Sequence, residues 1–111
     1  MRDNPQVIQK IYDLIVWYAG RIEKFPAGKR IILGDRILTG LLDTLDLLLE
    51  AYYTREKQPR LQRANLNLER LRYLSRLALD LKCVSISQFE FSARSIDEIG
   101  QQVGGWLKQA R

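Results

Sequence analysis

Hydrophobic residues recur every three or four positions along most of this chain, which is the spacing of one face of an α-helix. Four segments with this period follow one another, and no stretch alternates with the period of two that marks a half-buried strand. The pattern predicts helices over about 5–24, 30–57, 60–83 and 87–109. Because the connections are short, consecutive helices should pack antiparallel. The expected fold is all-α, a single domain over residues 1–111 that forms an up-down antiparallel four-helix bundle.

Prolines and small polar residues mark the expected helix ends. Asn4–Pro5 combines a side-chain cap with a proline at the first helical position. Phe25–Gly28 breaks the chain after the first helix, and Gln58–Pro59 is expected to end the second, because proline cannot continue a helix. Ser87 with Glu90 three residues later is a capping-box pattern, which predicts the start of the last helix.

The two middle helices carry apolar arcs wider than one buried face requires. A surface helix of a small monomer needs an apolar stripe only somewhat over 100° wide. Leucine, alanine and tyrosine occupy well over half of the circumference of segment 60–83, and segment 30–57 has a similar arc beside an acidic face. We therefore expect these helices to build both the bundle core and a contact with another subunit, so that the protein is a homo-oligomer.

Charge narrows the range of partners. The chain has 18 Lys and Arg against 13 Asp and Glu, a formal net charge of +5, which indicates polyanions such as nucleic acid, or merely solubility. Basic residues flank the breaks between helices and continue along the third helix, where they could engage phosphates without sequence preference. The candidate residues for contacts with nucleic acid or a partner are Lys29, Arg30, Arg60, Arg63, Arg70, Arg72, Arg76 and Lys82.

The same arginines have a structural interpretation. Arg72 follows Glu69 by three positions and Arg76 precedes an acid by four, so each can form a surface ion pair worth a few tenths of a kcal/mol. Arg63 and Arg70 project from the apolar arc and could bond the acids of a neighbouring subunit. The residues alone leave nucleic-acid binding and subunit pairing equally open, although Arg72 and Arg76, on the polar strip, are favoured for a functional contact.

Residue types needed for catalysis and metal binding are scarce. The chain has no histidine, and its single cysteine, Cys83, has neither an activating base nor metal-ligand spacing. Gly100, Gly104 and Gly105 lie within a helix rather than in a phosphate-binding loop. The spacing of Gly100 and Gly104 instead predicts a close approach by another helix. We expect no catalytic residue, no metal and no cofactor.

Cysteine usage and hydropathy indicate the compartment. A single cysteine cannot form an internal disulfide, which is typical of a reducing cytosol. No apolar stretch is long enough to span a membrane, and no signal-peptide pattern is present. The expected protein is cytoplasmic and has no membrane partner.

Several sequence blocks together resemble a known family. The blocks are, in chain order, FP at 25–26, LGDRI at 33–37, LLEA at 48–51, LERLR at 68–72, LA at 77–78 and IGQQVGGWL at 99–107. The first three are similar to the four-helix-bundle family that includes the ribosomal-RNA intervening-sequence proteins. The others resemble most closely its accessory variability determinant (Avd) branch, which belongs to diversity-generating retroelements.

The resemblance implies a non-enzymatic accessory protein. Avd proteins form a homopentameric barrel of four-helix bundles with a basic surface. They bind the reverse transcriptase of the element, bind RNA or DNA with little sequence preference, and support mutagenic retrohoming. In the family a basic residue often follows Phe–Pro, whereas this chain has Ala27–Gly28, so Lys29 and Arg30 would take over that role.

Two other functions remain open at this point. An intervening-sequence protein of the same fold would act without a reverse-transcriptase partner. A purely structural oligomerisation module would use its arginines only for contacts between subunits. The ring-like assembly and the number five come from the resemblance alone.

Overall fold

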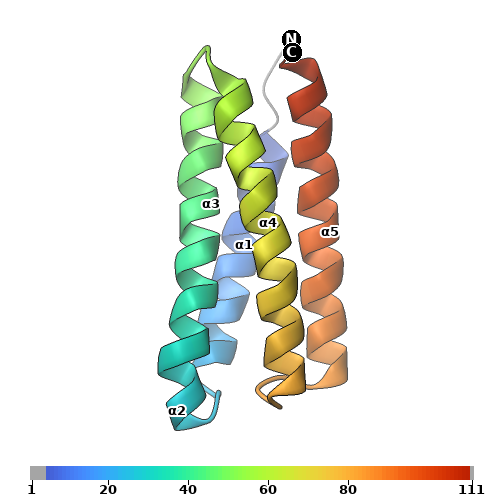
Figure 1. The fold of residues 1–111 in the computed structure, drawn as a ribbon. Coiled ribbons are helices and arrows are strands. Elements are labelled where there is room, and N and C mark those ends of the chain that lie inside the picture. Colours follow the sequence, from blue (N-terminus) through green and yellow to red (C-terminus); the bar gives the residue numbers. More distant parts are fainter. Residues whose placement is uncertain (1–4, 111) are drawn as a thin grey trace.

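The computed structural model describes residues 5–110, and along them no strand is present. The elements are α1 (Pro5–Ile22), the short α2 (Ala27–Lys29), a π-helical turn η1 (Arg30–Gly34), α3 (Asp35–Tyr53), α4 (Lys57–Asp80) and α5 (Ile86–Gln109). The four long helices run up and down beside one another (Figure 1), with α3 packed on α1 and α4, and α5 packed on α4 and α1. The predicted all-α fold of four long helices is confirmed.

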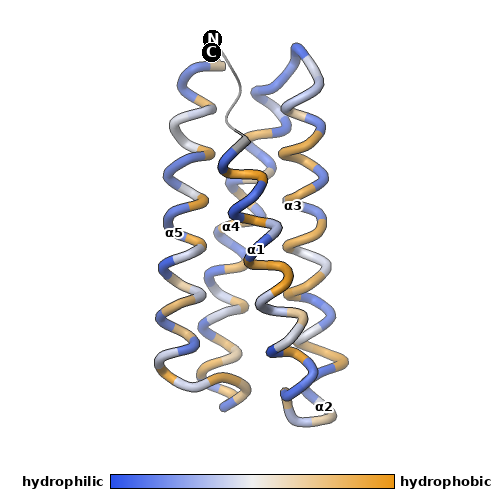
Figure 2. The backbone as a smooth tube through the Cα atoms, turned by 180° about the vertical axis from the view of Figure 1, so that it is seen from behind, coloured by the Kyte–Doolittle hydropathy of each residue, from blue (hydrophilic) through white to orange (hydrophobic). Residues whose placement is uncertain are grey.

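The core repeats with the alternating three- and four-residue spacing of a coiled coil. In α4 the buried positions are Leu61, Ala64, Leu68, Leu71, Ser75 and Ala78, and the other long helices show a similar series. This spacing keeps one stripe of each helix facing the bundle axis. Figure 2 shows hydrophobic positions recurring in this way along the tube. The remainder of each wide apolar arc therefore lies outside the core.

The connection between α3 and α4 differs from the prediction. Thr54 is extended, with φ −122° and ψ 161°, so α3 ends at Tyr53 rather than at Lys57. Pro59 does not end a helix but lies in the first turn of α4, where no intrahelical partner is needed for its missing N–H. Lys57 closes α3 by donating from Nζ to the carbonyl oxygens of Ala51 (2.7 Å) and Thr54 (2.6 Å).

The first and third helices also end earlier than predicted. Backbone N–H groups after Ile22 close α1 with short turns, and the expected Asn4 cap lies outside the described residues. At the end of α4, Lys82 has a left-handed backbone with φ 62°. The N–H of Cys83 donates to the carbonyl of Ala78 at 2.8 Å, which is the long bond of a Schellman motif.

The second helix begins earlier than predicted and passes through the π turn. A β-carbon at Gly34 would lie 2.6 Å from Cγ2 of Ile22, so only glycine fits where η1 crosses the end of α1. The backbone there is ordinary helix, with φ −59° and ψ −45°. Glycine is required for space and not for conformation. The same holds more weakly at Gly40, where a β-carbon would lie 3.2 Å from Leu71.

The glycine pair in α5 does not act as predicted. No atom lies within 4 Å of a β-carbon built on Gly104, so no helix of the described chain approaches there. At Gly100 the neighbour is the guanidinium of Arg72, at 3.1 Å, and not a helix backbone. The predicted close approach of a helix is wrong within the described part of the subunit, because Gly100 faces the long Arg72 side chain and Gly104 faces open space.

The predicted cap of α5 at Ser87 is wrong, because Ser85 caps the helix. Ser85 is extended and accepts a hydrogen bond from the N–H of Gln88 at 3.1 Å, while the Gln88 side chain accepts from the Ser85 N–H at 2.9 Å. Both Ser85–Gln88 and Ser87–Glu90 fit the capping-box pattern. The earlier pair is used because the Schellman turn ends just before it, so the helix already begins at Ile86.

Replacing Ser85 by alanine is expected to lower the free energy of unfolding by about 1 kcal/mol, because the Gln88 N–H loses its acceptor. Ser87→Ala is the matched control and should change it by less than about 0.5 kcal/mol. Urea unfolding followed by circular dichroism measures both variants. Equal losses at the two serines would contradict the observed cap.

Candidate functional site

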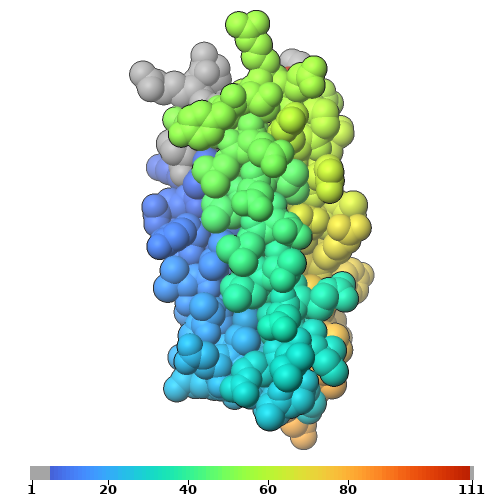
Figure 3. All heavy atoms as spheres, turned by 90° about the vertical axis from the view of Figure 1, so that its left-hand side faces the viewer, coloured from blue at the N-terminus to red at the C-terminus, as the bar shows by residue number. Residues whose placement is uncertain are grey.

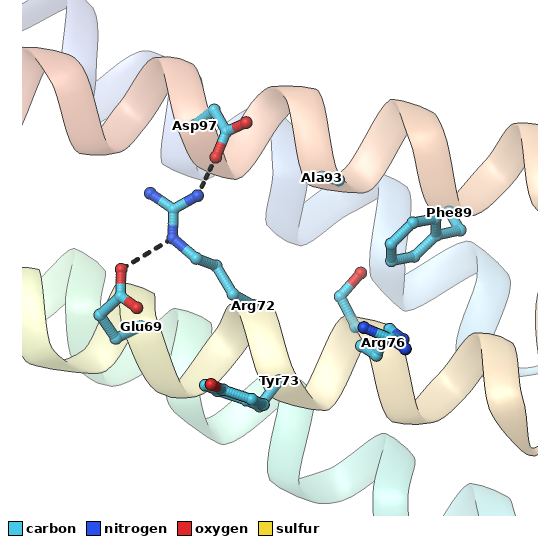
Figure 4. Close-up of a pocket in the computed structure, with 8 residues that line it drawn as sticks. Glu69, Arg72, Tyr73, Arg76, Phe89, Ala93 and Asp97 are labelled. Carbon is cyan, nitrogen blue, oxygen red and sulfur yellow. Dashed lines mark hydrogen bonds and ion pairs between the residues drawn. The ribbon is translucent and has the colours of Figure 1, made fainter.

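Arg72, one of the candidate residues, is held between two helices. Its Nε donates to Oε2 of Glu69 at 2.9 Å within α4, and its Nη1 donates to a carboxylate oxygen of Asp97 in α5. Figure 4 shows the guanidinium between the two carboxylates. Gly100 leaves room for the Arg72 guanidinium, since a β-carbon there would lie 3.1 Å from it. Arg72 therefore ties α4 to α5, and its charge is neutralised within the subunit.

An open groove of about 360 Å³ lies beside this ion pair. Its lining residues are Glu69, Arg72, Tyr73, Ser75, Arg76, Phe89, Ala93 and Asp97. Arg76 Nε lies 3.7 Å from Oδ2 of Asp80, so both ion pairs expected along α4 are confirmed. Two cations and two carboxylates line the groove, and it consequently has no excess positive charge to hold a phosphate.

The face of α4 opposite the core is apolar and basic together. Leu66 is 52% exposed, Tyr73 76% and Leu77 42%, and they lie seven and four residues apart on one side of the helix. Arg63 and Arg70 are exposed beside them. Arg70 donates to Oδ1 of Asn67 at 3.1 Å, whereas Arg63 makes no hydrogen bond or ion pair within residues 5–110. We name Leu66, Tyr73 and Leu77 the α4 stripe.

Three other candidates, Lys29, Arg30 and Lys82, meet at one end of the bundle. Lys29 Nζ donates to the carbonyl of Leu81 at 3.2 Å, which joins α2 to the turn that follows α4. Arg30 Nη1 donates to the carbonyl of Glu23 at 3.3 Å. Arg60 is separated from them at the opposite end, where Nε bonds Oε1 of Glu50 at 3.3 Å.

Lys24 belongs to the same end but was not among the predicted site residues. It is exposed and follows Glu23, whose carbonyl accepts from Arg30. The signal in the sequence was its position just before the Phe25–Pro26 break, with two basic residues just after it. Such a break turns the chain back, so cations on both sides of it are brought together.

The titratable groups in the interior serve structure. The Tyr18 hydroxyl bonds Oγ of Ser92 and lies 3.2 Å from Oγ of Ser75, and the two serines are 3.0 Å apart. Burial raises the pKa of Tyr18 above its ordinary 10.0, although both serine contacts lower it. Burial likewise raises the pKa of the Cys83 thiol, and the nearby Lys29 charge lowers it less. Neither group is therefore a ready nucleophile near neutral pH.

Within residues 5–110, no group of three or more Cys, Asp or Glu side chains is arranged to hold a metal ion. Every buried side-chain nitrogen or oxygen in that range has a hydrogen-bond partner. The helices formed by residues 5–110 include none with an apolar stretch that could span a membrane.

Comparison with known protein families gives a match. The bAvd-like family model matches residues 6–110, which include nearly all of α1 and every later element. The chain belongs to the bAvd-like family. No curated protein matches it.

Each block that resembles Avd proteins contributes at least one core position to this bAvd-like chain. Leu33 and Ile37 are buried on either side of Gly34, and Leu48 and Ala51 are fully buried in α3. The C-terminal block contributes a further set of core residues, Ile99, Val103 and Trp106. These blocks therefore identify how the bundle packs. They also hold exposed residues that could meet a partner, namely Leu49, Arg70 and Leu77.

Proposed function

We propose that this protein is a non-enzymatic, cytoplasmic accessory protein of a diversity-generating retroelement. It binds the reverse transcriptase of the element and nucleic acid, and so supports mutagenic retrohoming. The observation that carries the proposal is the bAvd-like family match over residues 6–110. The net charge of +5 supports an anionic partner.

Co-purification with the reverse transcriptase of the same element tests the proposal. A reverse-transcriptase gene beside the locus, with paired template and variable repeats, identifies the polymerase to use. The two proteins should co-elute, and deletion of the accessory gene should abolish transfer of mutated sequence to the variable repeat. Normal transfer without the gene would reject the accessory role.

The second candidate function is a structural oligomerisation module of the intervening-sequence type, without a polymerase partner. The observation that favours it is the internal pairing of Arg72 and Arg76, which leaves fewer free cations on α4 than the sequence indicates. A locus without a neighbouring reverse transcriptase, together with a stable assembly that binds no RNA, would support this function instead.

The proposed assembly is a ring-like homo-oligomer, for which the Avd resemblance suggests five subunits. Two features support a contact through α3 and α4. The α4 stripe and Leu42 and Leu49 of α3 remain exposed although they are large and apolar, and such patches mark interaction sites. Arg63 and Arg70 lie beside the α4 stripe, and the exposed acids Asp43 and Asp46 of α3 offer opposite charges to a neighbouring subunit.

Leu66→Glu with Leu77→Glu is expected to dissociate the assembly. Apolar anchors at an interface centre are worth about 2 kcal/mol or more each, so the dissociation constant should rise roughly 1,000-fold. Light scattering coupled to gel filtration measures the change in mass. Both leucine side chains are exposed in the subunit, so the double variant should keep the helical circular dichroism spectrum of the wild type.

Gln101→Glu with Gln109→Glu is the matched control, because it adds the same charge at exposed polar positions of α5. It should leave the mass of the assembly unchanged. A wild-type protein that is monomeric at micromolar concentration, or an unchanged mass in the leucine variant, would reject this interface.

A further inference from the structure

Four exposed cations gather at the end of the bundle where α1 and α4 finish. Lys24 follows α1, Lys29 and Arg30 lie in α2 and at the start of η1, and Lys82 follows α4. We call these four residues the basic end. Figure 1 places α2 and the α4–α5 turn at the same end, and Figure 3 shows the cyan and orange atoms of these segments meeting there.

Two hydrogen bonds join the members of the basic end. The bond from Lys29 Nζ to the Leu81 carbonyl, 3.2 Å, sets Lys29 against the residue that precedes Lys82. The bond from Arg30 Nη1 to the Glu23 carbonyl, 3.3 Å, sets Arg30 against the residue that precedes Lys24. Residues about fifty positions apart in the chain are thus neighbours, and this cluster exists only in the folded protein.

The four cations of the basic end are not paired with an acid within the described chain, and the exposed Glu23 beside Lys24 offsets only one of their charges. None of the four side chains forms an ion pair within residues 5–110, whereas Lys10, Arg60, Arg72 and Arg76 all do. The nearest acid along α4, Asp80, is paired with Arg76. Since an ammonium has three donor hydrogens and a guanidinium five, the single carbonyl bonds of Lys29 and Arg30 leave donors free for a ligand.

Lys82 has a backbone conformation that favours glycine. At φ 62° a side chain costs roughly 1 kcal/mol relative to glycine, and this position of a Schellman motif is usually glycine. Lysine here adds a cation to the basic end without a structural contact, because its side chain makes no hydrogen bond or ion pair within residues 5–110.

We propose that the basic end is the site where each subunit binds the phosphate backbone of nucleic acid. This inference rests on the proposed function and locates its nucleic-acid contact away from Arg72 and Arg76. Unpaired, exposed cations bind phosphates by releasing counterions, without reading bases. An anionic membrane is the competing ligand, because Ile31, Ile32 and Ile86 at the same end are exposed and could enter a lipid surface. The test therefore includes lipid vesicles.

The test is the salt dependence of binding to a fluorescently labelled single-stranded RNA of about 30 nucleotides, measured by anisotropy between about 50 and 300 mM NaCl. The double variant Lys24→Gln with Lys82→Gln removes two cations whose side chains make no hydrogen bond or ion pair within residues 5–110. It keeps the hydrogen bonds of Lys29 and Arg30 to the carbonyls of Leu81 and Glu23. Each lost phosphate contact should reduce the slope of log K against log salt by about 0.7, hence the double variant by about 1.4. Affinity at 100 mM should fall about tenfold or more.

Arg55→Gln with Lys108→Gln is the matched control. It removes the same net charge from exposed positions at the opposite end of the bundle, and its slope should remain that of the wild type. Equal loss in both double variants would reject the basic end in favour of a net-charge effect. RNA binding of wild-type strength in the Lys24/Lys82 variant would also reject the basic end as the binding site. It would leave the proposal that the protein binds nucleic acid unaffected.

Two further outcomes concern the proposed function. A wild-type protein that binds neither RNA nor single-stranded DNA at 50 mM salt, about the lowest in the series, would overturn both direct nucleic-acid binding and the basic-end site. Binding to phosphatidylserine vesicles without binding to RNA would assign the basic end to a membrane and reject our inference.

Discussion

Replacing Tyr18 by alanine is expected to lower the free energy of unfolding by about 3–5 kcal/mol, the usual cost of removing a large buried aromatic ring. Tyr18 is the largest fully buried side chain, and it joins α1 to α4 and α5 through Ser75 and Ser92. The loss is a large fraction of the roughly 5–15 kcal/mol that stabilises a domain. Urea unfolding at fixed protein concentration measures it, because assembly makes apparent stability depend on concentration.

Tyr18→Phe separates the ring from its hydroxyl. It should cost only about 1 kcal/mol, since Ser75 and Ser92 still bond each other at 3.0 Å. Burial raises the pKa of Tyr18 in the folded state, so the unfolded state loses this proton first. The contribution of this buried proton to the free energy of unfolding is complete below the unfolded pKa of about 10. It is lost as the pH rises through the pKa of Tyr18 in the folded state.

The wild type should accordingly lose stability above about pH 10 more steeply than the phenylalanine variant. The difference between the two proteins isolates Tyr18 from the other tyrosines and lysines. An equal pH dependence in both would contradict a buried, neutral Tyr18, and an alanine variant as stable as the phenylalanine variant would contradict its central packing.

Replacing Gly34 by alanine is expected to lower the free energy of unfolding by about 1–3 kcal/mol, the range for overpacking a core. The added methyl would lie 2.6 Å from Cγ2 of Ile22, a β-branched residue that is itself buried and has little freedom to move. The backbone of Gly34 is helical, so conformation gives no penalty. Thermal or urea unfolding by circular dichroism measures the change.

Gly20→Ala is the matched control because nothing lies within 4 Å of a β-carbon there and the residue is exposed. It should raise the free energy of unfolding by about 0.5–1 kcal/mol, from the better helix propensity of alanine. The two substitutions make the same chemical change with opposite signs. A higher free energy of unfolding in the Gly34 variant would mean that η1 and α1 separate easily. It would contradict the argument that Gly34 is needed because a β-carbon would collide with Ile22.

Some boundaries could be predicted from local chemistry and others could not. The break at Phe25–Gly28 was recognisable because proline and glycine act within a few residues. The start of α5 was ambiguous, since Ser85 and Ser87 are both followed three residues later by a suitable Glu or Gln. The position of Pro59 was misread because a proline fits equally after one helix or in the first turn of the next.

The candidate site shows the same division. The ion pairs of Arg72 with Glu69 and of Arg76 with Asp80 lie within one helix, so sequence spacing predicted them. The bond from Arg72 to Asp97 joins two helices, and its existence depends on the register of α4 against α5. Spacing within α4 does not reveal this second carboxylate, and the sequence therefore favours Arg72 for a functional contact.

The sequence by itself determined that this protein is helical, that its helices pack as a bundle, and that two of them carry more apolar surface than one core uses. It did so because helix periodicity and proline breaks are local properties of the chain. Only the tertiary structure decided which cations remain free. Lys24, Lys29 and Arg30 flank one turn of the chain, but Lys82 joins them only because long-range packing sets that turn against the end of α4.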